Sequence, residues 1–241
     1  MIGAYIAVVL GVAVWSLMTL VGRKIPDGVM RGITVFGGAF LLGVCCLELL
    51  PELGDYVILH DAHCDHLHGL WPYMAIMAGF LLQQALDGLS SHVEHGHTEE
   101  GFTFGGLMLG LCLHAFLEGM PLVREFPGEY FVSLGLMWGI VIHNIPVALL
   151  LVGLMVARGM GFWRVLMWLL LFGVMSPLGS LFSLFVLQPD FDWQKILVGM
   201  VVGVLLHVSS SILFDHKRNH FSWLNIGLMA LAFVAAGLIT H

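Results

Sequence analysis

Eight long apolar segments constrain the fold of this sequence more than any other feature. Each is close to the roughly 20 residues that an α-helix needs to cross the hydrocarbon core of a bilayer. None alternates apolar and polar residues with a period of two, so strands are not expected. The sequence therefore predicts an all-α polytopic membrane protein, with residues 1–241 forming one transmembrane domain of eight helices. The segments run approximately over residues 2–20, 33–53, 71–89, 102–123, 130–157, 162–187, 196–214 and 221–240.

The composition excludes a large soluble domain. Charged residues make up 10% of the chain and hydrophobic residues 59%, whereas an average soluble domain is about 25% charged. The net charge of −7 leaves no basic surface of the kind that nucleic-acid binding requires. The cysteines, Cys45, Cys46, Cys64 and Cys112, do not form a disulfide framework.

The basic residues are distributed unequally between the two sides of the predicted membrane. The loops after the first, fifth and seventh spans share one side and hold seven Lys and Arg residues, against two on the other side, Arg124 and Lys195. The positive-inside rule then places the basic loops in the cytoplasm and both termini outside. The seven residues are Arg23, Lys24, Arg31, Arg158, Arg164, Lys217 and Arg218.

Histidine is unusually frequent, with 13 residues, and two loops concentrate it. The loop after the second span is expected outside, and the loop after the third span is expected in the cytoplasm. Histidine-rich loops suggest metal binding, although a flexible polar loop can also bind metal only incidentally. The first loop holds His60, His63, His66 and His68, and the second holds His92, His95 and His97.

Ionisable residues inside the spans are candidate functional residues, because they are costly to insert, by about 2.5–3.5 kcal/mol for Asp, Lys or Arg. His114 and Glu118 are four residues apart and share one face of the fourth span. His143 lies at a similar depth in the fifth span, followed by Asn144. Imidazole and carboxylate groups suit zinc and its first-row neighbours. The sequence therefore predicts a mid-membrane metal site, or else a buried His–Glu pair that only ties two helices together.

Other polar residues lie nearer the ends of the spans. Glu48 is toward the outer side, Asp87 and His207 are toward the cytoplasmic side, and Ser176 is in the sixth span. Successive weak sites of this kind would form a cation pathway through the membrane. Taken singly, each residue is equally consistent with an interfacial or hydrogen-bonded polar group.

Two prolines are expected to interrupt spans. Pro146 removes its own N–H donor and clashes with the carbonyl of Ile142, next to His143. Pro177 would do the same in the sixth span. Paired broken helices near mid-membrane point to a transporter site, whereas a simple packing kink is the alternative, particularly at Pro177.

The motifs around these residues resemble those of the ZIP (Zrt/Irt-like) family of divalent metal transporters. The fourth-span motif corresponds to His114–Gly119 (HAFLEG) and the fifth-span motif to His143–Ala148 (HNIPVA). Ser176–Gly179 (SPLG) and Glu48–Glu52 (ELLPE) are similar to family elements in the sixth and second spans. His207 falls where members often have His-Glu in the seventh span. The ordered set covers nearly the whole chain.

The resemblance implies a ZIP-like bundle that moves Zn²⁺ into the cytoplasm by relative motion of helix bundles. Fe²⁺, Mn²⁺ and Cd²⁺ are alternative transported ions, and no cofactor is expected. Ligand positions of the family's binuclear centre carry Ala115, Val147 and Ser176 here. A single metal held by His114, Glu118 and His143, with Asn144 as a weak ligand, is therefore expected. Relatives in the family also suggest a homodimer. The compact loops are most simply explained by a location in a bacterial inner membrane.

Two other functions compete with transport. An intramembrane zinc hydrolase also needs His and carboxylate ligands, with an open zinc position for water. The sequence lacks the His-Glu-x-x-His and Gly-x-Ser-x-Gly motifs, so no enzyme is expected. It also lacks a Walker motif, which argues against ATP-driven transport. A metal sensor without transport is the third class, favoured by the missing ligand residues.

Overall fold

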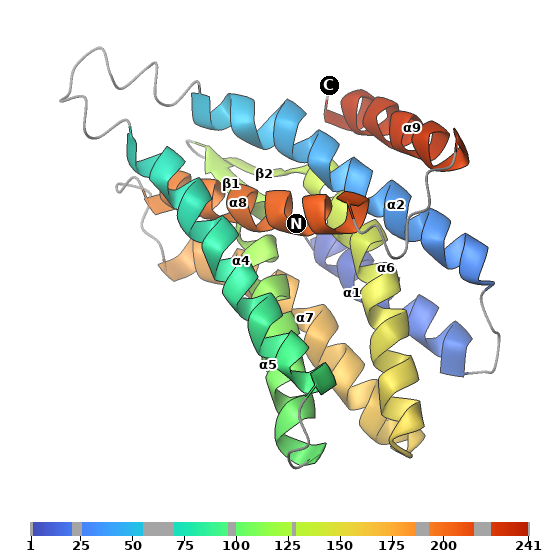
Figure 1. Cartoon of the computed structure of the whole chain (residues 1–241). Helices are drawn as coiled ribbons and strands as arrows, with labels where there is room; N and C mark the ends of the chain where they lie inside the picture. Colours follow the sequence, from blue (N-terminus) through green and yellow to red (C-terminus); the bar gives the residue numbers. More distant parts are fainter. Residues whose placement is uncertain are drawn as a thin grey trace.

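The computed structural model describes residues 2–20, 26–54, 70–95, 100–126, 129–186, 193–214 and 223–240. These residues form eight α-helices (Figure 1), as the apolar segments predict. The all-α fold class is therefore confirmed. The helices are α1 (Ile2–Leu20), α2 (Asp27–Val44), α4 (Trp71–His95), α5 (Glu100–Gly119), α6 (Leu134–Ala157), α7 (Phe162–Val186), α8 (Trp193–Phe214) and α9 (Trp223–Thr240).

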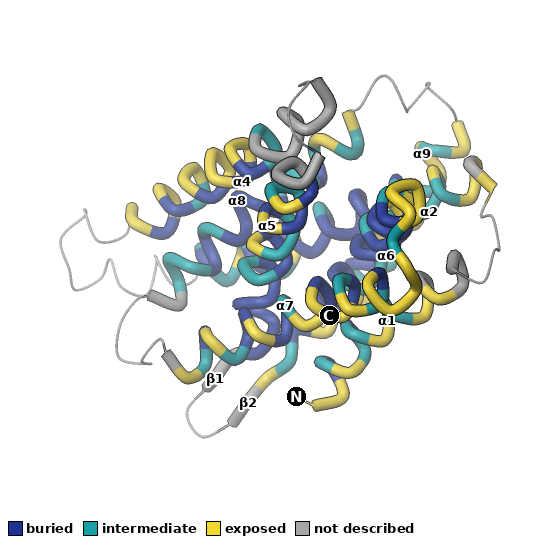
Figure 2. The backbone as a smooth tube through the Cα atoms, turned by 90° about the horizontal axis from the view of Figure 1, so that it is seen from below, coloured by how far each residue is buried: buried dark blue, intermediate teal, exposed yellow. Residues whose placement is uncertain are grey.

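Six helices in the described part of the chain are long and apolar enough to cross a membrane, fewer than the eight spans expected. The other two are α4 and α1, in which Ile2–Val14 is a described apolar stretch of the 19-residue helix. Helix α4 has 25 residues and so a length of about 37 Å, but Gln83, Gln84 and Asp87 lower its hydropathy. Many large apolar residues are exposed, and Figure 2 shows the buried residues gathered in the interior, with exposed residues on the outward faces of the helices. The protein is an integral membrane protein.

A short antiparallel hairpin lies between α5 and α6, where no strand was expected. Strand β1 (Val123–Phe126) pairs with β2 (Glu129–Val132), with Val123 opposite Val132. The 3₁₀-helix η3 (Met120–Leu122) contains Pro121 and follows the end of α5. The β-branched and aromatic residues that follow favour extended structure. The fourth and fifth spans are therefore shorter than the predicted ranges 102–123 and 130–157.

The other helix limits differ from the prediction by a few residues, except at the start of α2 and at the end of α4, which reaches His95 rather than residue 89. Helix α2 begins at Asp27, directly after Pro26, rather than at residue 33. It widens into the π-helix η1 (Cys45–Leu49), one turn before Pro51. Helices α6 and α7 continue through Pro146 and Pro177, so the expected breaks are absent from both. Packing against neighbouring helices can hold a helix together around the proline.

The helices form two bundles with separate apolar cores. One core joins α1, α5, α6 and α7 through residues such as Val12, Met108, Leu151 and Phe172. The other core is built mainly from α2, η1, α8 and α9, with further residues from α1 and α6, and α4 packs along α8. We call these the α5–α6 bundle (α1, α5, α6, α7) and the α4–α8 bundle (α2, α4, α8, α9). They meet where α2 contacts α6 and where α4 contacts α5.

Glycines allow α5 and α7 to approach each other at backbone distance. A Cβ atom on Gly119 would overlap the backbone of Ser176, and a Cβ atom on Gly179 would overlap the carbonyl oxygen of Phe116. Small residues at such crossings are typical of membrane helices, which associate by close packing. The crossing places the α5 turn that carries Glu118 directly against α7.

Candidate metal centre

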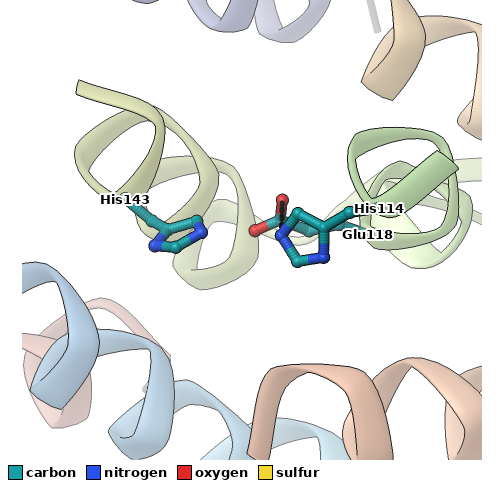
Figure 3. Close-up of side chains that lie close together, drawn as sticks. All are labelled: His114, Glu118 and His143. Carbon is teal, nitrogen blue, oxygen red and sulfur yellow. Dashed lines mark ion pairs between the residues drawn. The ribbon is translucent and has the colours of Figure 1, made fainter. Parts of the chain in front are cut away.

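Three buried side chains from two helices form a cluster inside the α5–α6 bundle. His114 and Glu118 come from α5 and His143 comes from α6, and their side chains face one another (Figure 3). Their potential ligand atoms all lie within 4.8 Å of one another. Within the described ranges, this is the one group of three or more His, Cys, Asp or Glu residues with metal-site spacing.

The spacing of the cluster is close to that of a metal site. His114 Nε2 lies 3.6 Å from Glu118 Oε2, and the rings of His114 and His143 meet edge to face with centroids 5.7 Å apart. Zinc holds nitrogen and oxygen ligands at about 2.0–2.2 Å in tetrahedral geometry, which separates neighbouring ligands by about 3.3 Å. Small side-chain rotations would therefore bring all three residues onto one ion.

Glu118 has the largest free-energy cost of burial in this cluster. It is fully buried, and neither carboxylate oxygen has a hydrogen-bond partner among the described residues. The side-chain oxygen of Asn144 is likewise buried without a partner in that part of the chain. A buried polar group that lacks its partner costs about 1–3 kcal/mol. A bound cation would supply the missing interaction, so the donor set fits a divalent metal.

Replacing Glu118 by methionine is expected to stabilise the metal-free protein while removing its response to zinc. The substitution removes the buried carboxylate at similar volume, which should raise stability by about 1–3 kcal/mol. In the wild type, zinc at 100 times its dissociation constant should add about 2.7 kcal/mol, and in Glu118→Met this gain should vanish. Thermal unfolding in detergent, with and without zinc, measures both effects. A metal-free variant less stable than the wild type would contradict the assignment of Glu118 as an uncompensated charge.

Asn144 lies next to the cluster in sequence, and Ser176 lies next to it in packing. Asn144 follows His143 on α6, and the backbone of Ser176 packs against Gly119 beside Glu118. The Ser176 hydroxyl is buried and has no hydrogen-bond partner in the described ranges. Their roles as ligands stay predictions. Ala115, where family members carry a ligand, is fully buried in the apolar core of the α5–α6 bundle.

Glu48 lies near the beginning of α6 rather than in the cluster. Its Oε1 accepts a hydrogen bond of 2.5 Å from the hydroxyl of Ser133, which also caps α6 by accepting from the N–H of Leu136. Ser133 precedes His143 by ten residues, or about 15 Å along the helix. A carboxylate near a helix N-terminus is favourable. Glu48 therefore has a structural interaction of its own, and its place in a pathway stays a prediction.

Asp87 of α4 and His207 of α8 contact each other through their side chains. Asp87 Oδ2 lies 3.4 Å from His207 Nδ1, with the Asp87 side chain 49% exposed. The other ring nitrogen of His207 lies 2.8 Å from Gln84 Oε1. The predicted inner pathway residues are thus adjacent to each other, although they come from spans far apart in sequence.

Sequence reasoning missed Gln83, which contacts the cluster directly. Its Oε1 lies 3.0 Å from Nδ1 of His114, and its side chain is buried. The signal was a pair of glutamines, Gln83 and Gln84, within an otherwise apolar segment. The side chains of the candidate loop ligands lie outside the described residues. These are His60, His63, His66, His68, His92, His95 and His97.

The fold and the cluster define a polytopic helical membrane protein with a buried centre suited to a divalent metal ion. The sequence model of the ZIP zinc transporter family matches residues 102–240, which begin in α5 and end with α9. This match covers more than half of the 241 residues, so the chain belongs to the ZIP family. The predicted resemblance to the ZIP family is thereby confirmed. No curated protein matches the chain.

Proposed function

We propose that this protein is a permease that moves Zn²⁺, or a related divalent ion, through the buried cluster of His114, Glu118 and His143. The observation that carries the proposal is the fully buried Glu118 carboxylate facing two imidazoles, in a chain that belongs to a family of metal transporters. Imidazole and carboxylate ligands suit Zn²⁺, and also Fe²⁺, Mn²⁺ and Cd²⁺. Membership of a transporter family favours transport over catalysis.

The centre is proposed to hold a single ion. The cluster offers one carboxylate and two neutral imidazoles, so a bound divalent ion keeps a net charge of +1. Asn144 would be a weak additional ligand. Ala115, Val147 and Ser176 supply no carboxylate for a second ion. Moderate binding of this kind helps transport, because an ion must leave a site as well as enter it.

The proposed pathway continues from the centre in both directions. Glu48 lies toward the beginning of α6, and the pair of Asp87 and His207 lies between α4 and α8. Inward transport follows from the resemblance to the family. The basic loops support a topology with both termini outside, most simply in a bacterial inner membrane. A homodimer, and metal binding by the two histidine-rich loops, remain predictions.

Zinc uptake into proteoliposomes loaded with a zinc-sensitive dye tests the proposal. The wild-type protein should give saturable uptake that protein-free liposomes lack. Absence of uptake by protein that still binds zinc would contradict transport and favour one of the other two functions. A zinc-dependent change in protease accessibility would then indicate a sensor. Cleavage of a membrane-embedded peptide, lost on chelation, would indicate a hydrolase.

A further inference from the structure

We propose that Gln83 is a positioning residue that fixes the tautomer of His114, so that the Nε2 lone pair of this histidine is presented to the metal. Gln83 is in α4, which belongs to the α4–α8 bundle, whereas His114 is in α5. The inference deepens the proposed function and rests on it, because it assigns a residue outside the cluster to the same metal centre.

A continuous chain of polar contacts leads from the cluster to α8. His114 Nδ1 lies 3.0 Å from Gln83 Oε1. The amide nitrogen of Gln83 donates a hydrogen bond of 2.8 Å to Asp87 Oδ1. The second oxygen of Asp87 then lies 3.4 Å from His207 Nδ1. Gln83 is only 5% exposed, so water offers it little competition for these partners.

The chemistry of the Gln83 amide determines which group donates and which accepts in this series of contacts. A carboxylate only accepts hydrogen bonds, so Asp87 selects the NH₂ end of Gln83. The carbonyl end of Gln83 then faces His114 and can only accept. His114 must therefore carry its proton on Nδ1 and keep Nε2 unprotonated.

The selected tautomer directs the free nitrogen toward the cluster. His114 Nε2 is the atom that lies 3.6 Å from Glu118 Oε2. A metal binds the unprotonated nitrogen of a neutral imidazole, and the hydrogen bond on the other nitrogen decides which one that is. Outer partners of this kind typically contribute about 10–100-fold to metal affinity or activity. Gln83 and Asp87 would act on the metal through His114, without touching it.

Replacing Gln83 by leucine tests this role, since leucine is of similar size and has no polar end. Zinc affinity is measured by competition with a chromophoric chelator, and the central site is the part of the binding that Glu118→Ala removes. In Gln83→Leu, the affinity of this site should weaken about 10–100-fold. The KM for zinc uptake should rise by the same factor. The control is Gln84→Leu, which alters the adjacent glutamine that contacts His207. Its zinc affinity at the central cluster should match the wild type, because Gln84 contacts His207 and not His114.

The tautomer itself gives a readout independent of transport. In metal-free protein labelled with ¹⁵N-histidine, the His114 signal is assigned by its loss in His114→Ala. We expect the Nδ1–H form in the wild type and in Gln84→Leu, and a loss of this preference in Gln83→Leu. An Nε2–H signal in the wild type, or unchanged zinc affinity in Gln83→Leu, would overturn the inference. Failure of the wild type to bind zinc would instead overturn the proposed function, while the tautomer measurement would still decide the role of Gln83.

Discussion

Replacing Glu118 by alanine is expected to abolish saturable zinc uptake into proteoliposomes. Glu118 supplies the one carboxylate of the buried cluster, and its loss leaves two neutral imidazoles to hold a dehydrated divalent ion. With zinc bound, Glu118 and the cation form a buried charged pair, and removing one member of such a pair costs about 3–5 kcal/mol. This corresponds to a loss of affinity of at least about 100-fold. Initial rates of dye response, normalised to the amount of reconstituted protein, measure the effect.

The control for this prediction is Met108→Ala on the same helix. Met108 is buried in the apolar core of the α5–α6 bundle and lies outside the cluster. Its truncation costs about 2–5 kcal/mol of stability by leaving a cavity and removes no ligand. The folded fraction of Met108→Ala should therefore keep saturable uptake. Wild-type uptake by Glu118→Ala would show that the ion does not pass through this cluster.

Replacing Gly179 by isoleucine is expected to separate α5 from α7 and to disable both folding and transport. Any side chain at this position would meet the backbone carbonyl of Phe116, which cannot move aside as a flexible side chain could. Overpacking in a tight core costs about 1–3 kcal/mol, and sometimes more. The separation would also move the turn that carries Glu118. We expect little monodisperse protein on size exclusion in detergent and a lower unfolding temperature.

Gly153→Ile provides the matched control for Gly179→Ile. Gly153 is also inside a transmembrane helix, α6, but a Cβ atom there would meet nothing within 4 Å in the described part of the molecule. This variant should fold and transport like the wild type. Equal behaviour of the two variants, whether both fold or both fail, would contradict the importance of the α5–α7 crossing.

The helices could be predicted from the sequence because each is a long apolar run, and a bilayer leaves few other structures for such runs. The hairpin over residues 123–132 was missed because its short strands adjoin two apolar segments and look like their continuation. The breaks at Pro146 and Pro177 were expected from local chemistry alone. Tertiary packing decides whether a helix continues around a proline, and the sequence does not display that packing.

The three residues of the cluster could be predicted from the sequence, but their contacts with other helices could not. His114 and Glu118 share a helix face by their spacing, and depth arguments placed His143 near them. The contact between Gln83 and His114 depends on which face of α4 meets α5, and a single helix does not reveal its neighbours. The pairing of Asp87 with His207 likewise depends on the packing of α4 against α8. Residue type and periodicity thus identified candidates, whereas contacts between bundles required the structure.

X-ray absorption at the zinc edge, on protein loaded with one equivalent of zinc, tests whether the cluster of His114, Glu118 and His143 holds a single ion. The loop ligands that would compete for the ion are first replaced by asparagine or serine, namely His60, His63, Cys64, His66, His68, His92, His95 and His97. We expect one zinc per chain, bound to two imidazoles and carboxylate oxygen at about 2.0–2.2 Å. The bound zinc should disappear in His143→Ala. Failure to retain zinc, sulfur at about 2.3 Å, or a second zinc about 3.5–4 Å away would contradict the single buried centre.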